Sequence, residues 1–204
     1  MSRTRAKDEA TPRGQARREQ ILNAASDLLL AEGYAAFSAR GVAARAGVSL
    51  SHVQYYFATP ADIVAELLDR FIAQYSAEVA KHYRVGGGTP VARLTRALEF
   101  LLNDEAYRRD CAVFMLEVAG FASRDPSIAA ALKRYYDVYL KALAVIVGEL
   151  NPGLTSATRL SRARQALALI EGMAMTRPFL GADDGAFSAR VAARAIERLA
   201  NGGR

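Results

Sequence analysis

The chain has 204 residues, of which 51% are apolar, and a net charge of +6 with a sequence pI near 9.7. This length and composition exclude a disordered chain and predict a globular protein with a real hydrophobic core. The basic balance permits a polyanionic partner but does not require one.

Cysteine content and hydropathy exclude further classes of protein. Cys111 is the single cysteine, so the chain has neither an intrachain disulfide nor a cysteine-cluster metal site, and we expect no metal and no cofactor. The sequence lacks a run of about 18 apolar residues, and its first residues lack the apolar stretch of a signal peptide. We therefore expect a soluble cytoplasmic protein with no membrane partner.

The N-terminal region divides into a basic arm and a first helix. Residues 1–15 have no apolar periodicity and are expected to form a flexible basic arm, either a disordered tail or an arm that enters a minor groove. Across residues 17–32, apolar side chains recur every three or four positions, as they do on one face of a helix. Gly33 is expected to end this helix.

Residues 38–57 carry the clearest motif of the chain. Ser38 has the N-cap side chain for a helix over 39–46, and Gly47 follows where a helix closes in the left-handed conformation. Ser49 can cap a second short helix over 50–57. Two short helices joined by a tight glycine turn form a helix-turn-helix, which presents its second helix to the major groove of DNA.

The second motif helix has one apolar and one polar side. Val53 and Phe57 form an i, i+4 pair expected to pack against the preceding helices. The opposite side has the reach and hydrogen-bonding capacity needed to contact DNA, and Gln54 suits a bidentate contact to adenine. Arg40 of the preceding helix suits phosphate or guanine. The predicted DNA-contacting residues are Ser38, Arg40, Ser49, Leu50, Ser51, His52, Gln54, Tyr55 and Tyr56.

Several of these residues have a specific expected role or an open alternative. Ser49, Tyr55 and Tyr56 suit phosphate oxygens, and Leu50 can touch a thymine methyl group. His52 is equally well explained as a plain surface residue, and Tyr56 as part of the core. A Gly-Val-Ser turn also occurs in helix pairs that bind protein instead of DNA.

The rest of the chain also predicts helices. Thr59-Pro60 is a typical helix start and opens a long helix to about Tyr83. Further helices are expected over 90–104, 107–123, 126–150, 155–180 and 186–200. The expected fold is all-α with about nine helices, in which a three-helix helix-turn-helix domain at 16–60 precedes a larger helical ligand-binding and dimerisation domain at 61–204.

The motif resembles the TetR family of bacterial transcriptional regulators. The family pattern, Thr/Ser-x-x-x-Ile/Val-Ala-x-x-Ala-Gly-Val-Ser with an aromatic-Phe ending, is carried here by Ser38, Val42, Ala43, Ala46, Gly47, Val48, Ser49, Tyr56 and Phe57. The resemblance spans about residues 17–66. It implies a homodimer whose two heads bind a palindromic operator in double-stranded DNA, with a helical C-terminal domain for a ligand and repression as the usual outcome.

Two departures from the family pattern concern DNA contact. Gln54 stands where many members have Tyr, so no base preference is carried over from the family. Pro60 stands where many members have Lys, which removes one cationic phosphate contact. The N-terminus of the helix that begins there is then expected to attract phosphate by itself.

The C-terminal helices supply the candidate effector contacts. Their apolar stripes are either plain core or pocket lining, and Tyr135 and Tyr139 are favoured because a buried hydroxyl can orient a ligand. Arg177 is either a buried counter-charge for an anionic ligand or a residue that reaches solvent. We expect a small, mainly apolar effector. The candidate contacts are Phe114, Glu117, Phe121, Tyr135, Tyr139, Met173 and Arg177.

The sequence also bears on dimerisation and on catalysis. The last two helices are rich in alanine and contain Gly172, so a pair from each subunit is expected to form a four-helix dimer interface. The sequence shows no HExxH motif, no glycine-rich phosphate loop and no nucleophile with a base nearby, so we expect no enzyme and no catalytic residue. The alternative for the C-terminal domain is a dimerisation or protein-docking module without an effector.

Overall fold

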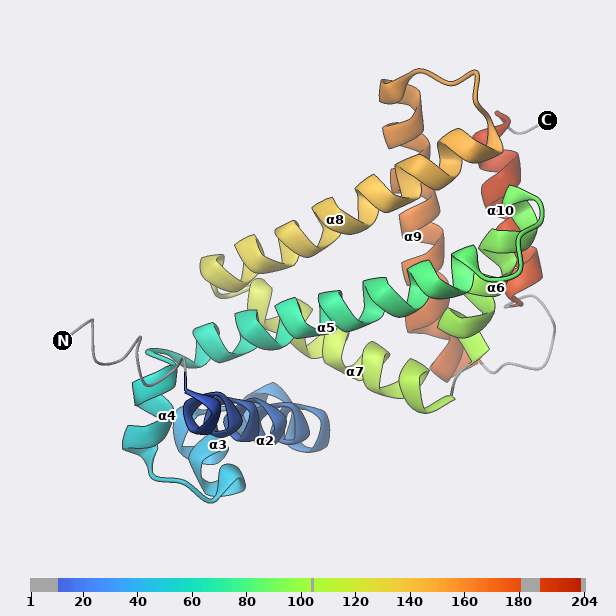
Figure 1. Cartoon of the computed structure of the whole chain (residues 1–204). Coiled ribbons are helices and arrows are strands. Elements are labelled where there is room, and N and C mark those ends of the chain that lie inside the picture. Colours follow the sequence, from blue (N-terminus) through green and yellow to red (C-terminus); the bar gives the residue numbers. More distant parts are fainter. Residues whose placement is uncertain (1–10, 104, 181–187, 203–204) are drawn as a thin grey trace. The chain divides into compact units, whose positions relative to one another are not determined.

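The computed structural model describes residues 11–103, 105–180 and 188–202, with side chains except those of residues 34, 35, 75, 103–111 and 177–180. Within these ranges the chain forms nine helices and no strand, which confirms the all-α expectation. The helices are α2 Pro12–Ala36, α3 Ala39–Ala46, α4 Leu50–Tyr56, α5 Pro60–Arg84, α6 Pro90–Asn103, α7 Glu105–Ala122, α8 Pro126–Leu150, α9 Ser156–Leu180 and α10 Ala189–Ala200 (Figure 1).

Helix α2 begins earlier than expected. It begins at Pro12, so residues 12–15, which were expected in the flexible arm, are helical; residues 1–10 lie outside the described part. The earlier start has a local cause, because the Thr11 hydroxyl accepts a hydrogen bond from the Gly14 amide at 3.0 Å and Pro12 suits a first helical turn. At the other end Gly33 (φ 70°, ψ −174°) has a non-helical backbone, so the first helix ends there as expected, and a second short helical segment continues across this kink to Ala36.

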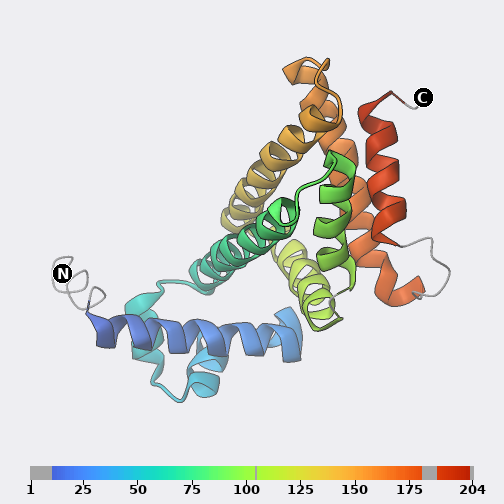
Figure 2. The same ribbon diagram turned by 45° about the vertical axis from the view of Figure 1, so that its right-hand side comes forward.

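The chain forms two compact units, of which unit 1 comprises the chain up to Phe71 together with Val113–Lys133. In this unit α2 packs on α3 and α3 packs on α4 (Figures 1 and 2). The first part of α5 is joined to α2 by the ion pair between Arg18 and Glu66, at 2.6 Å, and by a second pair between Arg70 and Glu19.

Unit 1 extends beyond the boundary expected at residue 60. The reason is aromatic packing between segments far apart in the sequence. The ring of Phe71 in α5 stacks on Phe114 in α7, with centroids 5.0 Å apart, and Phe37 meets Phe121 edge-on. Phe114 and Phe121 are buried, as is Val118 between them on α7. The second half of α7 therefore belongs to the same packed unit as the helix-turn-helix.

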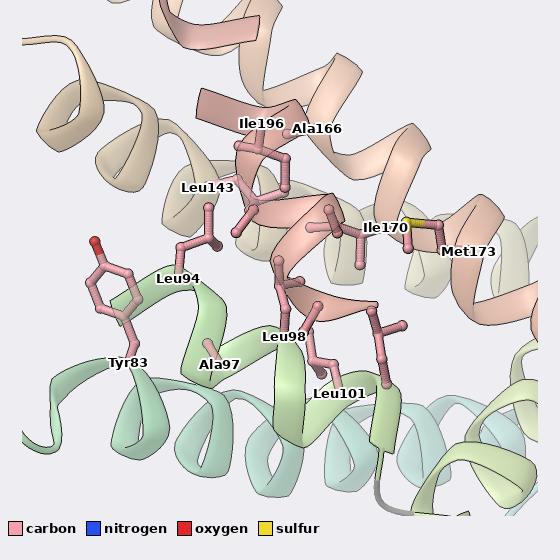
Figure 3. Packing of buried hydrophobic residues seen from close by; sticks show 14 of the residues in the cluster. Tyr83, Leu94, Ala97, Leu98, Leu101, Leu143, Ala166, Ile170, Met173 and Ile196 are labelled. Carbon is pink, nitrogen blue, oxygen red and sulfur yellow. The ribbon is translucent and has the colours of Figure 1, made fainter. Parts of the chain in front are cut away.

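Unit 2 comprises Ile72–Ala112 and the chain from Arg134 onward. Its core lies between α6 and α10, which pack against each other, and includes buried residues of α8 and α9. Figure 3 shows Leu94, Leu98 and Leu101 of α6 directed toward Ile196 of α10 and Ile170 of α9. The small alanines of α9 and α10 in this cluster allow the helices to approach closely.

Candidate functional site

The turn between α3 and α4 has the predicted capping geometry. The Ser38 side chain accepts a hydrogen bond from the Gly41 amide at 3.1 Å, and the Ser49 side chain accepts one from the His52 amide at 3.3 Å. Gly47 closes α3 in the left-handed conformation, with φ 63° and ψ 34°. This confirms a helix-turn-helix at the expected residues.

Helix α4 is held in place by its buried side. Val53 is 0% exposed and Phe57, just after the helix, is 4% exposed, as predicted. The guanidinium of Arg18 lies over the Phe57 ring at 5.1 Å, and the side-chain Nε2 of Gln20 donates a hydrogen bond to the carbonyl of Ala46 at 2.8 Å. A seven-residue helix has little stability alone, so this packing is what keeps α4 formed.

The other side of α4 is open to solvent and polar. Ser51, His52 and Gln54 are exposed, and Arg40 in the first turn of α3 is exposed as well. Leu50, Tyr55 and Tyr56 are half-buried, and the rings of the two tyrosines meet edge-on with centroids 5.0 Å apart. The face combines hydrogen-bond donors and acceptors with one cation, which is the chemistry that reads base edges and phosphates.

Two predicted DNA-contacting hydroxyls already serve the fold. The Ser38 oxygen caps α3, and the Ser49 oxygen caps α4 while lying 2.8 Å from the Ser51 hydroxyl and 3.1 Å from His52 Nδ1. A capping oxygen still carries a hydroxyl hydrogen, which can be donated to a phosphate oxygen. The interactions of Ser49 also set the orientation of the His52 ring.

The start of α5 has a feature that the sequence reasoning missed. The Thr59 amide donates to the Asp62 carboxylate at 2.8 Å, and the Asp62 amide donates to the Thr59 hydroxyl at 3.2 Å. This reciprocal cap places a negative charge on the first turn of the helix and occupies two of its donors. The α5 N-terminus is therefore less attractive to phosphate than expected, because Asp62 already complements it.

Of the candidate effector residues of unit 1, Glu117 and Phe121 lie against the end of α2 and Phe37, whereas Phe114 contacts Phe71 of α5. Phe114 and Phe121 are 5% and 6% exposed. The carboxylate of Glu117 lies against the kink of α2, since a Cβ added at Gly33 would be 3.0 Å from Glu117 Oε1. Together with the contact between Phe121 and Phe37, this connects one face of α7 to the end of α2.

The candidates of unit 2 lie mainly in its core. Met173 belongs to the hydrophobic cluster beside Ile170 (Figure 3), and Tyr139 packs against the same cluster. Tyr135 is buried, and its ring centroid lies 6.1 Å from that of Tyr139. The structure brings these two tyrosines together, whereas the side chain of Arg177 lies outside the described residues.

A partly buried acid in unit 2 was not predicted from the sequence. Burial raises the pKa of Glu171 in α9 to about 7, although the hydrogen bond with Tyr136 of α8 acts in the opposite direction. Burial and the neighbouring Glu171 raise the pKa of Tyr136 to about 12. A single glutamate in an alanine-rich helix forms no motif, and only the packing of α8 on α9 brings it to a tyrosine.

Within residues 11–103, 105–180 and 188–202, no cluster of three or more histidine, cysteine or acidic side chains is arranged to hold a metal ion. None of the helices in those ranges combines the length and apolarity needed to cross a membrane.

A capped helix-turn-helix with an exposed polar second helix, followed by helices alone, defines the class of helix-turn-helix transcriptional regulators. The model of bacterial regulatory proteins of the tetR family matches residues 21–67. The model of the C-terminal region of BetI-type transcriptional repressors matches residues 90–201, more than half of the chain. The chain therefore belongs to the TetR family of DNA-binding transcriptional regulators.

Individual relatives agree with this assignment. The chain is 30% identical over 165 residues, 79% of each chain, to an uncharacterized helix-turn-helix transcriptional regulator in the dhlA 5′ region of Xanthobacter autotrophicus. A transcriptional regulator from Rhodococcus sp. Rha1 has a similar crystal structure, with 26% identity, a TM-score of 0.69 and coverage of 90% of this chain and 94% of that one. A protein from Saccharomonospora viridis solved in complex with choline shares the fold, with 21% identity, a TM-score of 0.70 and coverage of 92% and 96%.

Proposed function

We propose that the protein is a homodimeric repressor that binds a palindromic operator in the cytoplasm and leaves it when a small, mainly apolar effector binds. The observation that carries the operator-binding part is the division of α4 into two sides. Val53 is fully buried, while Ser51, His52 and Gln54 are exposed and have no role in the core. A short helix fixed on one side and polar on the other is suited to insertion into a major groove.

Each DNA-contacting residue has a role that fits its surroundings. Gln54 contacts adenine, and Arg40 contacts phosphate or guanine. Ser38, Ser49, Tyr55 and Tyr56 contact phosphates, with the two serines donating through the hydroxyl hydrogens that remain after capping. Leu50 lies at the start of α4 and contacts a thymine methyl group, while Ser51 and His52 complete the exposed face.

The coupling between effector and DNA runs through two continuous helices. Helix α5 has no break between Pro60 and Arg84, so it is one rod whose residues up to Phe71 belong to unit 1 and whose remainder belongs to unit 2. Helix α7 likewise contributes to both units, and its Glu117 and Phe121 contact the end of the head's first helix. An effector that prefers one position of these helices shifts the equilibrium by its differential affinity, typically about 1–3 kcal/mol.

The candidate effector contacts form two groups, Phe114, Glu117 and Phe121 in unit 1 and Tyr135, Tyr139, Met173 and Arg177 in unit 2. Buried aromatic rings with a few polar atoms are typical of pockets for mainly apolar small molecules. The choline complex of the Saccharomonospora viridis protein shows that a protein of this fold can hold a small molecule, and supports an effector here.

The dimer forms through α9 and α10. Val191 of α10 is 46% exposed, and Gly172 of α9 has open space around the position of an added Cβ. An exposed apolar side chain beside small residues suits close packing of helices from a second subunit.

Selection of binding sites from random duplexes by the full-length protein tests the operator hypothesis. We expect an enriched inverted repeat bound by two protomers, with an affinity that falls steeply as salt rises. Sequence-blind binding alone would contradict the proposal. A compound screen then separates the two views of the C-terminal domain, because an effector must both raise the melting temperature and release the operator, whereas a docking module shows neither effect.

A further inference from the structure

Unit 2 contains a cavity of about 640 Å³, broadly open to solvent, between α6 and α10 and beside the end of α8. None of the residues proposed to contact DNA or the effector lines it. Its volume is within the range of small-molecule sites, roughly 300–1,000 Å³. The cavity is therefore large enough for a small molecule, and the chemistry of its lining decides which kind of molecule it can hold.

Arg96 of α6 is held at the cavity by the loop that precedes its helix. Its Nη2 donates a hydrogen bond to the Gly87 carbonyl at 2.6 Å. The three glycines at 86–88 all have left-handed φ values, 77°, 60° and 96°, which side-chain-bearing residues rarely adopt. A Cβ added at Gly86 or Gly88 would lie 3.9–4.0 Å from the guanidinium. The glycine loop thus curves closely around Arg96 and keeps its charge at the cavity.

Two of the arginine side chains that line the cavity have no ion-pair partner among the described residues. Glu149 is paired with Arg93 at 2.7 Å, and Glu197 with Arg194 at 3.0 Å. Within the described residues, no carboxylate forms an ion pair with Arg96 or with the exposed Arg190 of α10, which both line the cavity.

Glu99 is the remaining acidic residue in the lining, and it is exposed. Its negative charge can balance the positive charge of only one of the two arginines, Arg96 and Arg190. The charged residues of the lining are three arginines and three glutamates, and Arg93, which pairs with Glu149 from outside the lining, brings the total charge at the cavity to +1. Arginine is also the side chain best suited to hold a carboxylate with two parallel hydrogen bonds.

The other side of the lining is apolar. Pro90 and Val91 in the first turn of α6 and Leu150 at the end of α8 contribute to it. We propose that this cavity binds a small organic acid, whose carboxylate is held by Arg96 and Arg190 while its apolar body lies against Pro90, Val91 and Leu150. This site is separate from the proposed effector contacts.

The test uses benzoate as the probe and benzamide as its uncharged counterpart, added to the isotope-labelled full-length protein. The two probes share an aromatic ring, so a difference between them isolates the carboxylate. We expect benzoate, but not benzamide, to shift the backbone amide signals of Gly87, Val91 and Ala92 in NMR spectra. Loss of a charge-assisted bidentate contact should weaken benzoate binding about tenfold or more in both Arg96→Gln and Arg190→Gln.

Matched variants keep the test independent of folding. Arg198→Gln removes an exposed arginine that lies in α10, as Arg190 does, but does not line the cavity. This variant should bind benzoate as the unmodified protein does. Arg96→Lys retains the charge at the loop and should retain part of the affinity. Equal benzoate binding in Arg190→Gln and Arg198→Gln, equal shifts with benzamide, or no shift near Gly87 at millimolar benzoate would each overturn the proposal. None of these outcomes bears on the separate proposal that the protein binds an operator.

Discussion

The ring of Phe121 in α7 meets the ring of Phe37 edge-on, with centroids 5.6 Å apart and an interplanar angle of 89°. Phe37 lies between α2 and α3, immediately before Ser38, the N-cap of α3. A displacement of the last turns of α7 would therefore act directly on the residue that precedes the first motif helix. This contact gives the proposed coupling a definite position in unit 1.

The strength of this contact is measurable in a double-mutant cycle. Phe121→Leu and Phe37→Leu keep an apolar side chain at each position but remove the edge-to-face geometry. We expect a coupling free energy of about 0.5–1.5 kcal/mol between the two substitutions, the usual value of an aromatic pair. Urea unfolding of the four proteins measures it, and strictly additive losses would show that the rings contribute only through burial.

Gln54→Ala tests the proposed reading of DNA. Gln54 is exposed, so its removal should leave the fold intact while relaxing preference at one base pair of each half-site, at a cost of about 1–3 kcal/mol. Tyr56→Phe is the comparison variant, since loss of a phosphate contact should weaken all sequences about equally. Affinities on the operator and its single-base variants decide, and an unchanged base preference in Gln54→Ala would remove this residue from recognition.

Two glycine substitutions should change stability in opposite directions. Gly47 has φ 63°, so Gly47→Ala should destabilise the protein by about 1–2 kcal/mol, although no atom lies within 4 Å of the added Cβ. Gly120 lies within α7 with equally open space, and Gly120→Ala should stabilise by up to about 1 kcal/mol. Thermal melting measures both, and a stabilising Gly47→Ala would contradict the role of the left-handed turn.

Glu171 should give the protein a pH-dependent stability. Because burial raises its pKa from 4.5 to about 7, the folded state retains a proton that the unfolded chain releases, and the free energy of unfolding should fall between pH 4.5 and 7. Glu171→Gln should flatten this decline and stabilise the protein above pH 7 by at most about 3 kcal/mol. Glu99→Gln, at an exposed position, is the control and should retain the decline. A parallel pH profile for Glu171→Gln would contradict the assignment.

Val191→Glu tests the proposed subunit interface. Val191 is 46% exposed on α10, and a carboxylate there would be buried without a partner in a dimer formed through α9 and α10. We expect this variant to sediment as a monomer at concentrations where the unmodified protein sediments as a dimer. Val145→Glu on α8, where the valine is 62% exposed, should leave the dimer intact. The opposite pattern would place the interface on α8.

Local features of the sequence predicted local structure well. The capping residues Ser38 and Ser49 and the left-handed Gly47 depend on their immediate neighbours, and all three behave as expected. The start of α2 is an exception. Thr11-Pro12 is the same type of helix start as Thr59-Pro60, but residues 1–15 have no apolar periodicity, so the periodicity alone predicts a start that is too late.

Features that depend on packing between distant segments could not be predicted in the same way. Helical periodicity identified Phe114 and Phe121 as buried, but it carries no information on which helix they meet. Their contacts with Phe71 and Phe37 place half of α7 in the unit of the head. The pairing of Glu171 with Tyr136 similarly requires the packing of α8 on α9, which no spacing along the chain encodes.

The division of α4 into a buried and an exposed side has a consequence for how this protein can change over generations. Exposed positions away from special features usually tolerate substitution within about 0.5 kcal/mol, whereas truncating a buried phenylalanine costs about 3–5 kcal/mol. Ser51, His52 and Gln54 can therefore be exchanged with little effect on stability, while Val53 and Phe57 cannot. If these three side chains read the operator as proposed, a duplicated copy of the gene can acquire a new set of target sequences through their codons, without first acquiring compensating mutations in the core.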